Sequence, residues 1–268
     1  MARFLVMGVV NVTPDSFSDG GLWTDPAQAV AHGLDLAADG AQLVDVGGES
    51  TRPGADPVTA EEELARVAPV VHGLVAGGAR VSIDTSKAEV ARAALAAGAD
   101  YVNDVAAFRS DPDLAGVVAD AGAECCLMHM LGDPRTMQRD PRYDDVVDDV
   151  RAFLEERLAA VVAAGVAEDR VHLDPGIGFG KTLAHNLELL DRLDEIVAVG
   201  RPVMIGTSRK SFIGKLTGQA VAAERIEGTI ATSVLALERG ATIFRVHDVA
   251  PVHRALTVAA ATLRRHGP

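Results

Sequence analysis

Short apolar segments recur along the chain, and most are preceded by an alanine-rich stretch that ends in a glycine. Each segment is followed by a polar cluster. Segments that are apolar throughout are typical of strands buried on both faces, as in a parallel sheet whose strands are joined by helices. We predict eight such strands, at residues 4–10, 41–46, 81–84, 101–103, 125–128, 171–173, 203–205 and 242–244.

Eight strand–helix units in a chain of 268 residues favour a closed TIM (β/α)8 barrel of the α/β class. The alternative is a doubly wound open sheet, which usually carries a GxGxxG phosphate loop after its first strand. No such loop follows residues 4–10. Because no linker or composition break divides the chain, we expect residues 1–268 to form a single domain.

The sequence also marks helix ends. Asp25-Pro26 predicts a capping side chain before a first-turn proline, and Thr59…Glu62 and Ser86…Glu89 predict capping boxes. Residues 130–143 hold two Asp-Pro pairs and are predicted to stay irregular until a helix near Asp144. Glycine suits the left-handed residue that ends a helix, and six helices are predicted to end at Gly40, Gly98, Gly122, Gly165, Gly200 and Gly240.

Composition narrows the class of protein. A balance of 48% apolar and 24% charged residues is that of a soluble globular protein, and no apolar run approaches the roughly 20 residues that cross a bilayer. The net charge of −13 argues against a nucleic-acid partner but allows a small anion held by a few basic residues. The first eight residues are too few for a signal peptide, and the adjacent Cys125 and Cys126 cannot easily bridge. We therefore expect a cytoplasmic protein.

Polar or ionic side chains follow all eight predicted strands, where TIM barrels carry their catalytic residues. Strand ends often turn polar as they reach water, which accounts for any one of these residues. All eight together, with three arginines and a lysine, favour a site that handles an anion. The residues are Asn11, Glu49–Arg52, Asp84, Asn103, Asp104, His129, Asp174, Ser208–Ser211, Arg245 and His247.

Two loops extend this rim. Residues 11–21 are polar and rich in turn formers around a lone Phe17, which either plugs the loop or stacks on a substrate ring. Residues 47–54 offer hydroxyls, backbone N–H groups and the Arg52 guanidinium, a combination that suits phosphate oxygens.

These segments carry a resemblance. Asn11–Asp19, Gly47–Gly54, Ser82–Thr85, Asp174–Phe179, Gly206–Ser211 and Arg245–Asp248 resemble, in order and in frame, the motifs of the dihydropteroate synthase family. The resemblance runs from about residue 4 to residue 265. It implies an enzyme that joins 4-aminobenzoate to 6-hydroxymethyl-7,8-dihydropterin diphosphate and releases diphosphate.

The resemblance also implies roles for single residues. A carboxylate can accept two N–H groups from the amino-pyrimidine edge of a pterin at once, and an asparagine can both donate and accept there. The alternative to pterin binding for Asp84 and Asp174 is a structural role as helix caps. The implied pterin contacts are Asp84, Asn103, Val105, Met128, Asp174 and Lys210.

The other implied contacts concern the diphosphate and the aminobenzoate. Asn11 would hold Mg2+, and His247 lies on the same strand face as Arg245, although a core histidine is the plain alternative. Asn11, Thr51, Arg52, Arg245 and His247 are the implied diphosphate contacts. Phe17, Thr51, Pro53, Phe179, Lys210 and Ser211 are the implied aminobenzoate contacts, and Asp19, Lys210, Arg245 and His247 the implied catalytic residues.

Two other functions fit the same pattern. One is a methyltransferase that uses methyltetrahydrofolate, which needs no diphosphate site. The other is a non-catalytic pterin-binding paralogue, which we expect to lack Asp15, Phe17 or Lys210; all three are present.

Further expectations follow from the resemblance. The family is commonly dimeric through its late helices, so a homodimer is expected. We also expect sulfonamide sensitivity, because Ser82–Lys87 lacks the insertion of insensitive relatives. The chain departs from the family at Ala106–Arg109, where many members have small residues such as Ser-Gly.

Overall fold

The computed structural model describes residues 4–13, 25–51 and 54–263. Over these residues the strands are β1 (Leu5–Asn11), β2 (Leu43–Gly47), β3 (Val81–Asp84), β4 (Tyr101–Asp104), β5 (Glu124–Met128), β6 (Val171–Asp174), β7 (Met204–Ile205) and β8 (Ile243–Val246). The α-helices are α1 (Pro26–Ala38), α2 (Ala60–Ala76), α3 (Ala88–Ala96), α4 (Leu114–Ala121), α5 (Val146–Ala163), α6 (Leu183–Asp191), α7 (Leu193–Val197), α8 (Ser211–Thr217), α9 (Ile226–Glu238) and α10 (Val249–Leu263). Two 3-10 turns are η1 (Glu168–Arg170) and η2 (Ala222–Glu224).

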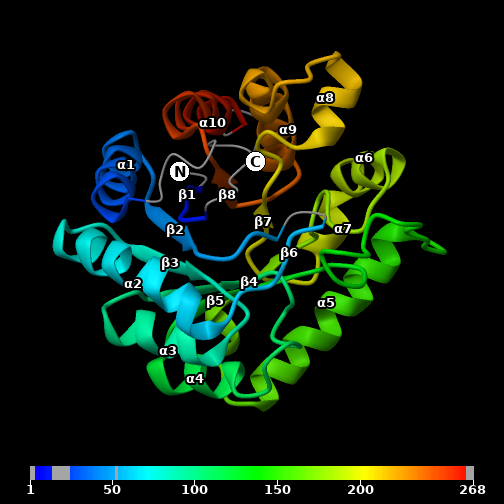
Figure 1. The fold of residues 1–268 in the computed structure, drawn as a ribbon. Helices are drawn as coiled ribbons and strands as arrows, with labels where there is room; N and C mark the ends of the chain where they lie inside the picture. Colours follow the sequence, from blue (N-terminus) through cyan, green and yellow to red (C-terminus); the bar gives the residue numbers. More distant parts are fainter. Residues whose placement is uncertain (1–3, 14–24, 52–53, 264–268) are drawn as a thin grey trace.

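The strands form one parallel sheet in the order β6-β5-β4-β3-β2-β1-β8-β7, with the helices around it (Figure 1). Because β1 pairs with both β2 and β8, the sheet curls on itself. A parallel bridge between Leu173 and Val203 joins β6 to the start of β7 and completes the ring. The predicted TIM barrel is confirmed, and the open doubly wound sheet is excluded.

Alternate residues of each strand face opposite sides of the barrel wall. The outward set, which includes Val44, Val102 and Leu127, belongs to the large core between the strands and the helices. The inward set at the amino ends of the strands forms a separate plug inside the barrel, made by Met7, Leu43, Tyr101, Cys126, Met204 and Ile243. Cys125 lies in the outer core and Cys126 in the plug, and both are buried and unbridged, as the adjacent positions predicted.

Most predicted helix ends are found. Asp25 accepts a hydrogen bond from Ala27 N, and all six predicted glycines have positive φ. Of the capping box predicted at Thr59, one half is found: Thr59 accepts from Glu62 N, whereas the Glu62 carboxylate bonds Arg66. The capping box at Ser86 is wrong: α3 begins at Ala88, and its N-cap Lys87 makes no side-chain capping bond. Ser86 donates instead to the Asp104 carboxylate on β4, so a tertiary partner replaces the local one.

Candidate active site

A polar layer lies inside the barrel, two residues beyond the apolar plug on the same strands. Because successive residues alternate between faces, a step of two keeps the inward direction while moving toward the carboxyl end. On β2 this step leads from Leu43 to Asp45, and on β4 from Tyr101 to Asn103. The same step on β8 leads from Ile243 to Arg245.

Arg245 on β8 joins this layer by bonding carboxylates on two other strands. Its Nε donates to Asp45 Oδ2 at 2.6 Å, and its Nη2 donates to Asp84 Oδ2 at 2.7 Å. Burial lowers the pKa of the Arg245 guanidinium, but the two carboxylates outweigh burial and raise that pKa above its ordinary value. For the Asp84 carboxyl, burial raises the pKa, and the positive charge of Arg245 opposes this rise. Asp84 is therefore an ion-pair partner at the cavity and not a helix cap.

Asp174 and Lys210 both line the inner end of the barrel mouth, and the charge of each acts on the other. Asp174 Oδ1 accepts the Gly176 N–H at 2.7 Å, a bond that fixes the loop after β6 and leaves Oδ2 for other donors. Burial raises the pKa of Asp174, and the Lys210 charge opposes this. Lys210 donates to the Ile177 carbonyl, and its Nζ lies 4.3 Å from the Phe179 ring centre. Burial lowers the pKa of the Lys210 ammonium to about 8.

Two cavities at the carboxyl end share many of these side chains. The inner cavity, of about 70 Å³, holds every residue that the resemblance assigned to the pterin. It is lined by Thr51, Asp84, Asn103, Val105, Met128, Asp174, Phe179, Gly206, Ser208, Lys210, Arg245 and His247.

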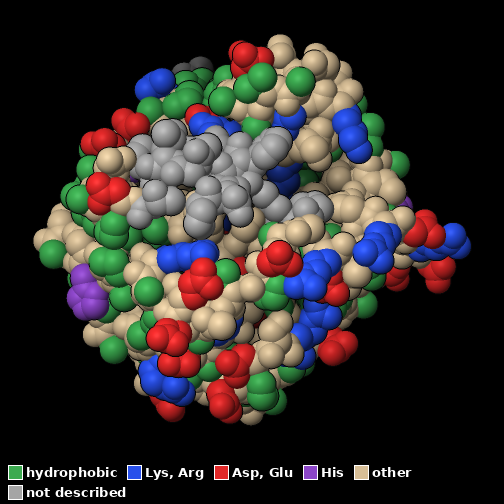
Figure 2. All heavy atoms as spheres, viewed as in Figure 1, with side chains coloured by type: hydrophobic (Ala, Val, Ile, Leu, Met, Phe, Trp, Pro, Cys, Tyr) green, Lys and Arg blue, Asp and Glu red, His purple; other side chains and the backbone are tan. Residues whose placement is uncertain are grey.

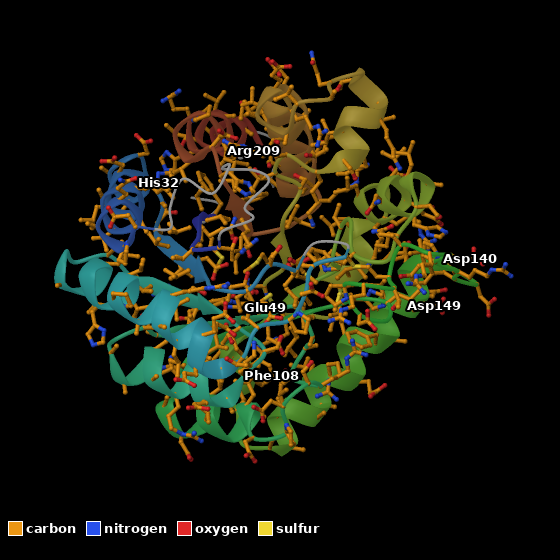
Figure 3. All side chains as sticks on the ribbon, in the orientation of Figure 1. His32, Glu49, Phe108, Asp140, Asp149 and Arg209 are labelled. Carbon is orange, nitrogen blue, oxygen red and sulfur yellow. The ribbon has the colours of Figure 1, made fainter. Side chains whose placement is uncertain are left out.

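The outer cavity, of about 520 Å³, adjoins the inner one. Residues assigned to the diphosphate and the aminobenzoate line it, namely Asn11, Thr51, Phe179, Lys210, Ser211, Arg245 and His247. Glu49 and Arg209 also line it; in Figure 3 Glu49 lies near the centre of the view and Arg209 above it. Phe17, Asp19, Arg52 and Pro53, together with Asp15, lie outside the described residues.

The loop after β7 and the end of β8 meet at the outer cavity. Ser208 Oγ lies 3.0 Å from His247 Nδ1 and accepts the His247 backbone N–H at 3.1 Å. Arg209 donates to both carboxylate oxygens of Asp248, at 2.9 and 2.7 Å. His247 is therefore a side chain of the cavity wall rather than of the apolar core, whereas the Arg209 charge is balanced locally.

The loop after β2 is anchored from two helices. Lys87 Nζ donates to the carboxylates of Glu49 and Glu63, the second at 2.5 Å, and Arg66 Nη1 donates to the Gly48 carbonyl at 2.7 Å. Glu63 is fully buried in α2. These bonds fix the backbone that presents Thr51 to both cavities.

The loop after β4 is strained and strongly braced. Ala107 and Phe108 both have positive φ, which is unfavourable for residues with a side chain. Asp104 accepts the backbone N–H groups of Ala106 and Phe108, at 2.9 and 2.6 Å, and Arg157 donates to the Ala107 carbonyl. The brace holds Val105 at the wall of the inner cavity.

The donor set at the mouth is compatible with Mg2+. Asn11 offers a side-chain amide oxygen to the outer cavity, and Mg2+ commonly takes one or two protein oxygens and fills its shell with water and substrate phosphate. Within the part of the chain that the structure describes, no group of three or more His, Cys, Asp or Glu side chains could hold a metal. A site of this kind would therefore depend on the diphosphate for its remaining oxygens.

Two buried residues near the cavity were not predicted. Asp45 was overlooked because it lies inside a strand and not after it, although a charge within Leu43–Gly47 was itself a signal. Lys181 Nζ contacts His129 Nδ1 at 2.9 Å and the Phe179 carbonyl at 3.0 Å. It joins the loop after β6 to the end of β5, and no local pattern indicated this contact.

The surface and the helices add two observations. On the face seen in Figure 2, basic and acidic side chains are interspersed rather than gathered into a basic field. In the described residues no helix is long and apolar enough to span a membrane.

Comparison with known proteins identifies the family. Residues 7–247 match the model of the family described as pterin binding enzyme. The dihydropteroate synthase of Neisseria meningitidis serogroup B is 49% identical over 258 residues, which cover 94% of this chain and 90% of that protein.

Solved structures agree with this match. A Yersinia pestis dihydropteroate synthase in a sulfonamide drug complex is 44% identical with a TM-score of 0.94, covering 97% of this chain and 94% of that one. The Xanthomonas albilineans dihydropteroate synthase solved with 4-aminobenzoic acid is 51% identical with a TM-score of 0.91, covering 99% and 94%. Its complex with 7,8-dihydropteroate gives 48% identity and a TM-score of 0.87, covering 99% and 95%. The chain belongs to the pterin-binding enzyme family, and within it to the dihydropteroate synthases.

Proposed function

We propose that this enzyme joins 4-aminobenzoate to 6-hydroxymethyl-7,8-dihydropterin diphosphate, giving 7,8-dihydropteroate and diphosphate. One observation carries the proposal: the six residues assigned to the pterin line one cavity, which opens directly onto a larger, more basic one. A relative that binds 4-aminobenzoic acid and 7,8-dihydropteroate supports the same substrate and product.

Recognition of the pterin follows from complementary donors and acceptors. Asp174 accepts N–H groups of the amino-pyrimidine edge, and Asn103 reads the same edge. Lys210 lines both cavities, so its ammonium serves the pterin and the aminobenzoate at their junction. Met128 and Val105 supply the apolar walls of the slot.

The reaction begins with departure of diphosphate. The C–O bond of the pterin methylene breaks, the electron pair leaves with the diphosphate oxygen, and the ring delocalises the positive charge. Arg52, Arg245 and His247 stabilise the charge that grows on the leaving group. Two of the five N–H groups of Arg245 are bonded to carboxylates, so others remain for this task.

The second step joins the two substrates. The amine nitrogen of 4-aminobenzoate attacks the methylene carbon, a C–N bond forms, and the nitrogen loses a proton. Phe17, Pro53, Phe179 and Ser211 shape the slot that holds the amine in line, and Asp19 supports the cation. Asn11 would hold Mg2+, which would neutralise charge on the diphosphate.

Product formation with each substrate omitted in turn is the primary test. We expect 7,8-dihydropteroate only when both substrates are present. Methyl transfer from methyltetrahydrofolate would favour the methyltransferase, and pterin binding without turnover would favour the non-catalytic paralogue.

Substitutions at the diphosphate contacts test the assignment of the outer cavity. Arg245→Ala and His247→Ala should weaken binding of the diphosphorylated pterin much more than binding of the bare hydroxymethyl-pterin. Equal losses for both ligands would assign these residues to the shape of the pocket.

Sulfonamide inhibition is part of the proposal, because β3 and α3 are joined without an insertion. We propose ordered binding, in which diphosphate binds first and the aminobenzoate slot is then completed by the loops 11–21 and 47–54, of which residues 14–21 and 52–53 lie outside the described residues. The drug should bind weakly to the free enzyme and much more tightly with diphosphate and Mg2+. Identical affinities in the two titrations would contradict the ordered model, and turnover that persists at drug concentrations far above that of 4-aminobenzoate would contradict sensitivity.

We also propose a homodimer in the cytoplasm. Leu235 on α9 and Val258 on α10 are 47% and 69% exposed on neighbouring helices, which suits an interface through the late helices. Sedimentation of the wild type and of Val258→Asp tests the dimer: a monomeric wild type would refute it, and a shift of Val258→Asp toward monomer would locate the interface.

A further inference from the structure

Asp45 is a buried carboxylate directly beneath the pterin cavity. It lies in the middle of β2, it is fully buried, and it lines neither the inner nor the outer cavity. A charged group in such a place is costly unless its hydrogen-bonding capacity is met. The hydrogen-bond partners of Asp45 therefore indicate the role of its carboxylate.

Three strands supply those partners. Asp45 Oδ1 accepts the Ser82 hydroxyl of β3 at 2.5 Å. Asp45 Oδ2 accepts Asn103 Nδ2 of β4 at 3.1 Å and Arg245 Nε of β8 at 2.6 Å. Two of the three partners line the inner cavity, whereas Ser82 does not. Asp45 thus holds two ligand-facing side chains from below.

The bond to Asn103 fixes which end of its amide faces which way. A carboxylate only accepts hydrogen bonds, so Asn103 must turn its nitrogen toward Asp45. Because Asn103 also lines the inner cavity, its oxygen is then the end of the amide left to accept from a ligand. Without Asp45 the amide could rotate by half a turn and present the opposite pattern to a ligand.

The bond to Arg245 fixes the guanidinium in the same way. Asp45 and Asp84 take two adjacent N–H groups of one planar group, so the plane and its remaining donors are set before a ligand arrives. Pre-set donors cost a ligand less ordering free energy than mobile ones.

We propose that Asp45 is a positioning residue for recognition of the pterin diphosphate, which holds the Asn103 amide in its orientation toward the pterin and the Arg245 guanidinium in its orientation toward the diphosphate. This inference rests on the proposed pterin site and extends it to a residue that touches no substrate. Ser82 contributes to the same arrangement, because its hydroxyl donates to the second carboxylate oxygen of Asp45.

The test is calorimetric binding of 6-hydroxymethyl-pterin, which does not depend on turnover. Asp45→Asn keeps the shape but removes the negative charge that faces Arg245 and leaves one acceptor oxygen where the carboxylate has two, so it should weaken pterin binding by about tenfold or more. Ser82→Ala, a milder change, should weaken it by roughly two- to fivefold. Tyr101→Phe is the matched control, because it removes a buried hydrogen bond inside the barrel one layer below; its pterin affinity should equal that of the wild type.

A double-mutant cycle separates positioning from a general structural effect. In an Asn103→Ala background, Asp45→Asn should weaken pterin binding only about threefold, because one of the groups that Asp45 positions is gone. A loss of equal size in both backgrounds, or wild-type affinity in Asp45→Asn and Ser82→Ala, would overturn the inference while leaving the proposed function intact. A wild type that binds no pterin would overturn both.

Discussion

The two ends of the barrel interior are built from the same strands and differ in almost every other respect. At the amino end, Leu43, Tyr101 and Ile243 belong to an apolar plug. Two residues further along each strand, at the carboxyl end, Asp45, Asn103 and Arg245 form a bonded polar layer. Within the plug, Tyr101 Oη lies 2.9 Å from Nδ1 of His172 on β6.

This contrast separates stability from recognition. The plug removes large side chains from water and makes no contact with either cavity, so it stabilises the fold. The polar layer keeps ionised groups in a partly buried place for the sake of a ligand. The expectation is that substitutions in the plug change the free energy of unfolding, and substitutions in the polar layer change ligand affinity.

The largest expected effect lies in the plug. Tyr101→Ala removes a fully buried aromatic ring and should lower the free energy of unfolding by about 3–5 kcal/mol. Urea unfolding measures this loss. The folded variant should keep the wild-type affinity for pterin, and a large loss of pterin affinity would show that the two ends are coupled.

The second effect is a pH dependence of stability that arises from His172, the hydrogen-bond partner of the plug residue Tyr101. Burial lowers the pKa of His172 in the folded state to about 4, below the ordinary 6.5 of the unfolded chain. The unfolded state therefore binds the extra proton first, and stability falls as the pH decreases from about 6.5 to about 4, by on the order of 2–3 kcal/mol.

Unfolding curves of the wild type and of His172→Gln between pH 7.5 and 4.5 test this prediction. The variant should lose less stability across the window than the wild type does. Parallel curves for the two proteins would assign the acid sensitivity to other groups.

A third effect concerns the polar layer at Asp174. Asp174→Asn removes charge-assisted bonds to the pterin and should weaken its binding by roughly 1.5–3 kcal/mol. The thermal midpoint should barely move, in contrast to the plug variants. Calorimetry with a pterin measures the first quantity, and unchanged affinity would reject the assignment of Asp174.

The smallest effect is a change in the pH profile of activity. Because burial lowers the pKa of Lys210 to about 8, the free enzyme loses this positive charge as the pH rises through about 8. The value of kcat/KM for the diphosphorylated pterin should fall over the same range. Lys210→Arg should move the falling limb to higher pH, and an unmoved limb would assign it to another group.

The sequence predicted the barrel because each strand is a local pattern, apolar throughout and bounded by glycine and a polar end. It also predicted that Asp174 and His247 lie at one end of the barrel, because the carboxyl ends of parallel strands meet there. It could not predict the ion pair between Arg245 and Asp84, which joins residues 161 positions apart. The rule of looking after each strand also missed Asp45, which lies two residues deeper, and the local rule for capping failed at Ser86, where Asp104 is a stronger partner.

The seam between β6 and β7 has a consequence for hydrogen exchange. Among the described residues, one isolated bridge between Leu173 and Val203 joins these strands, and β7 itself is only two residues long. Regions with few backbone hydrogen bonds open locally at low free-energy cost, so amide protons here should exchange faster than those of β1 or β2. Asp174 and Lys210 lie on the two sides of this seam and face the same cavity. A pterin that binds both of them spans the seam, and its binding should slow exchange at this side of the barrel first.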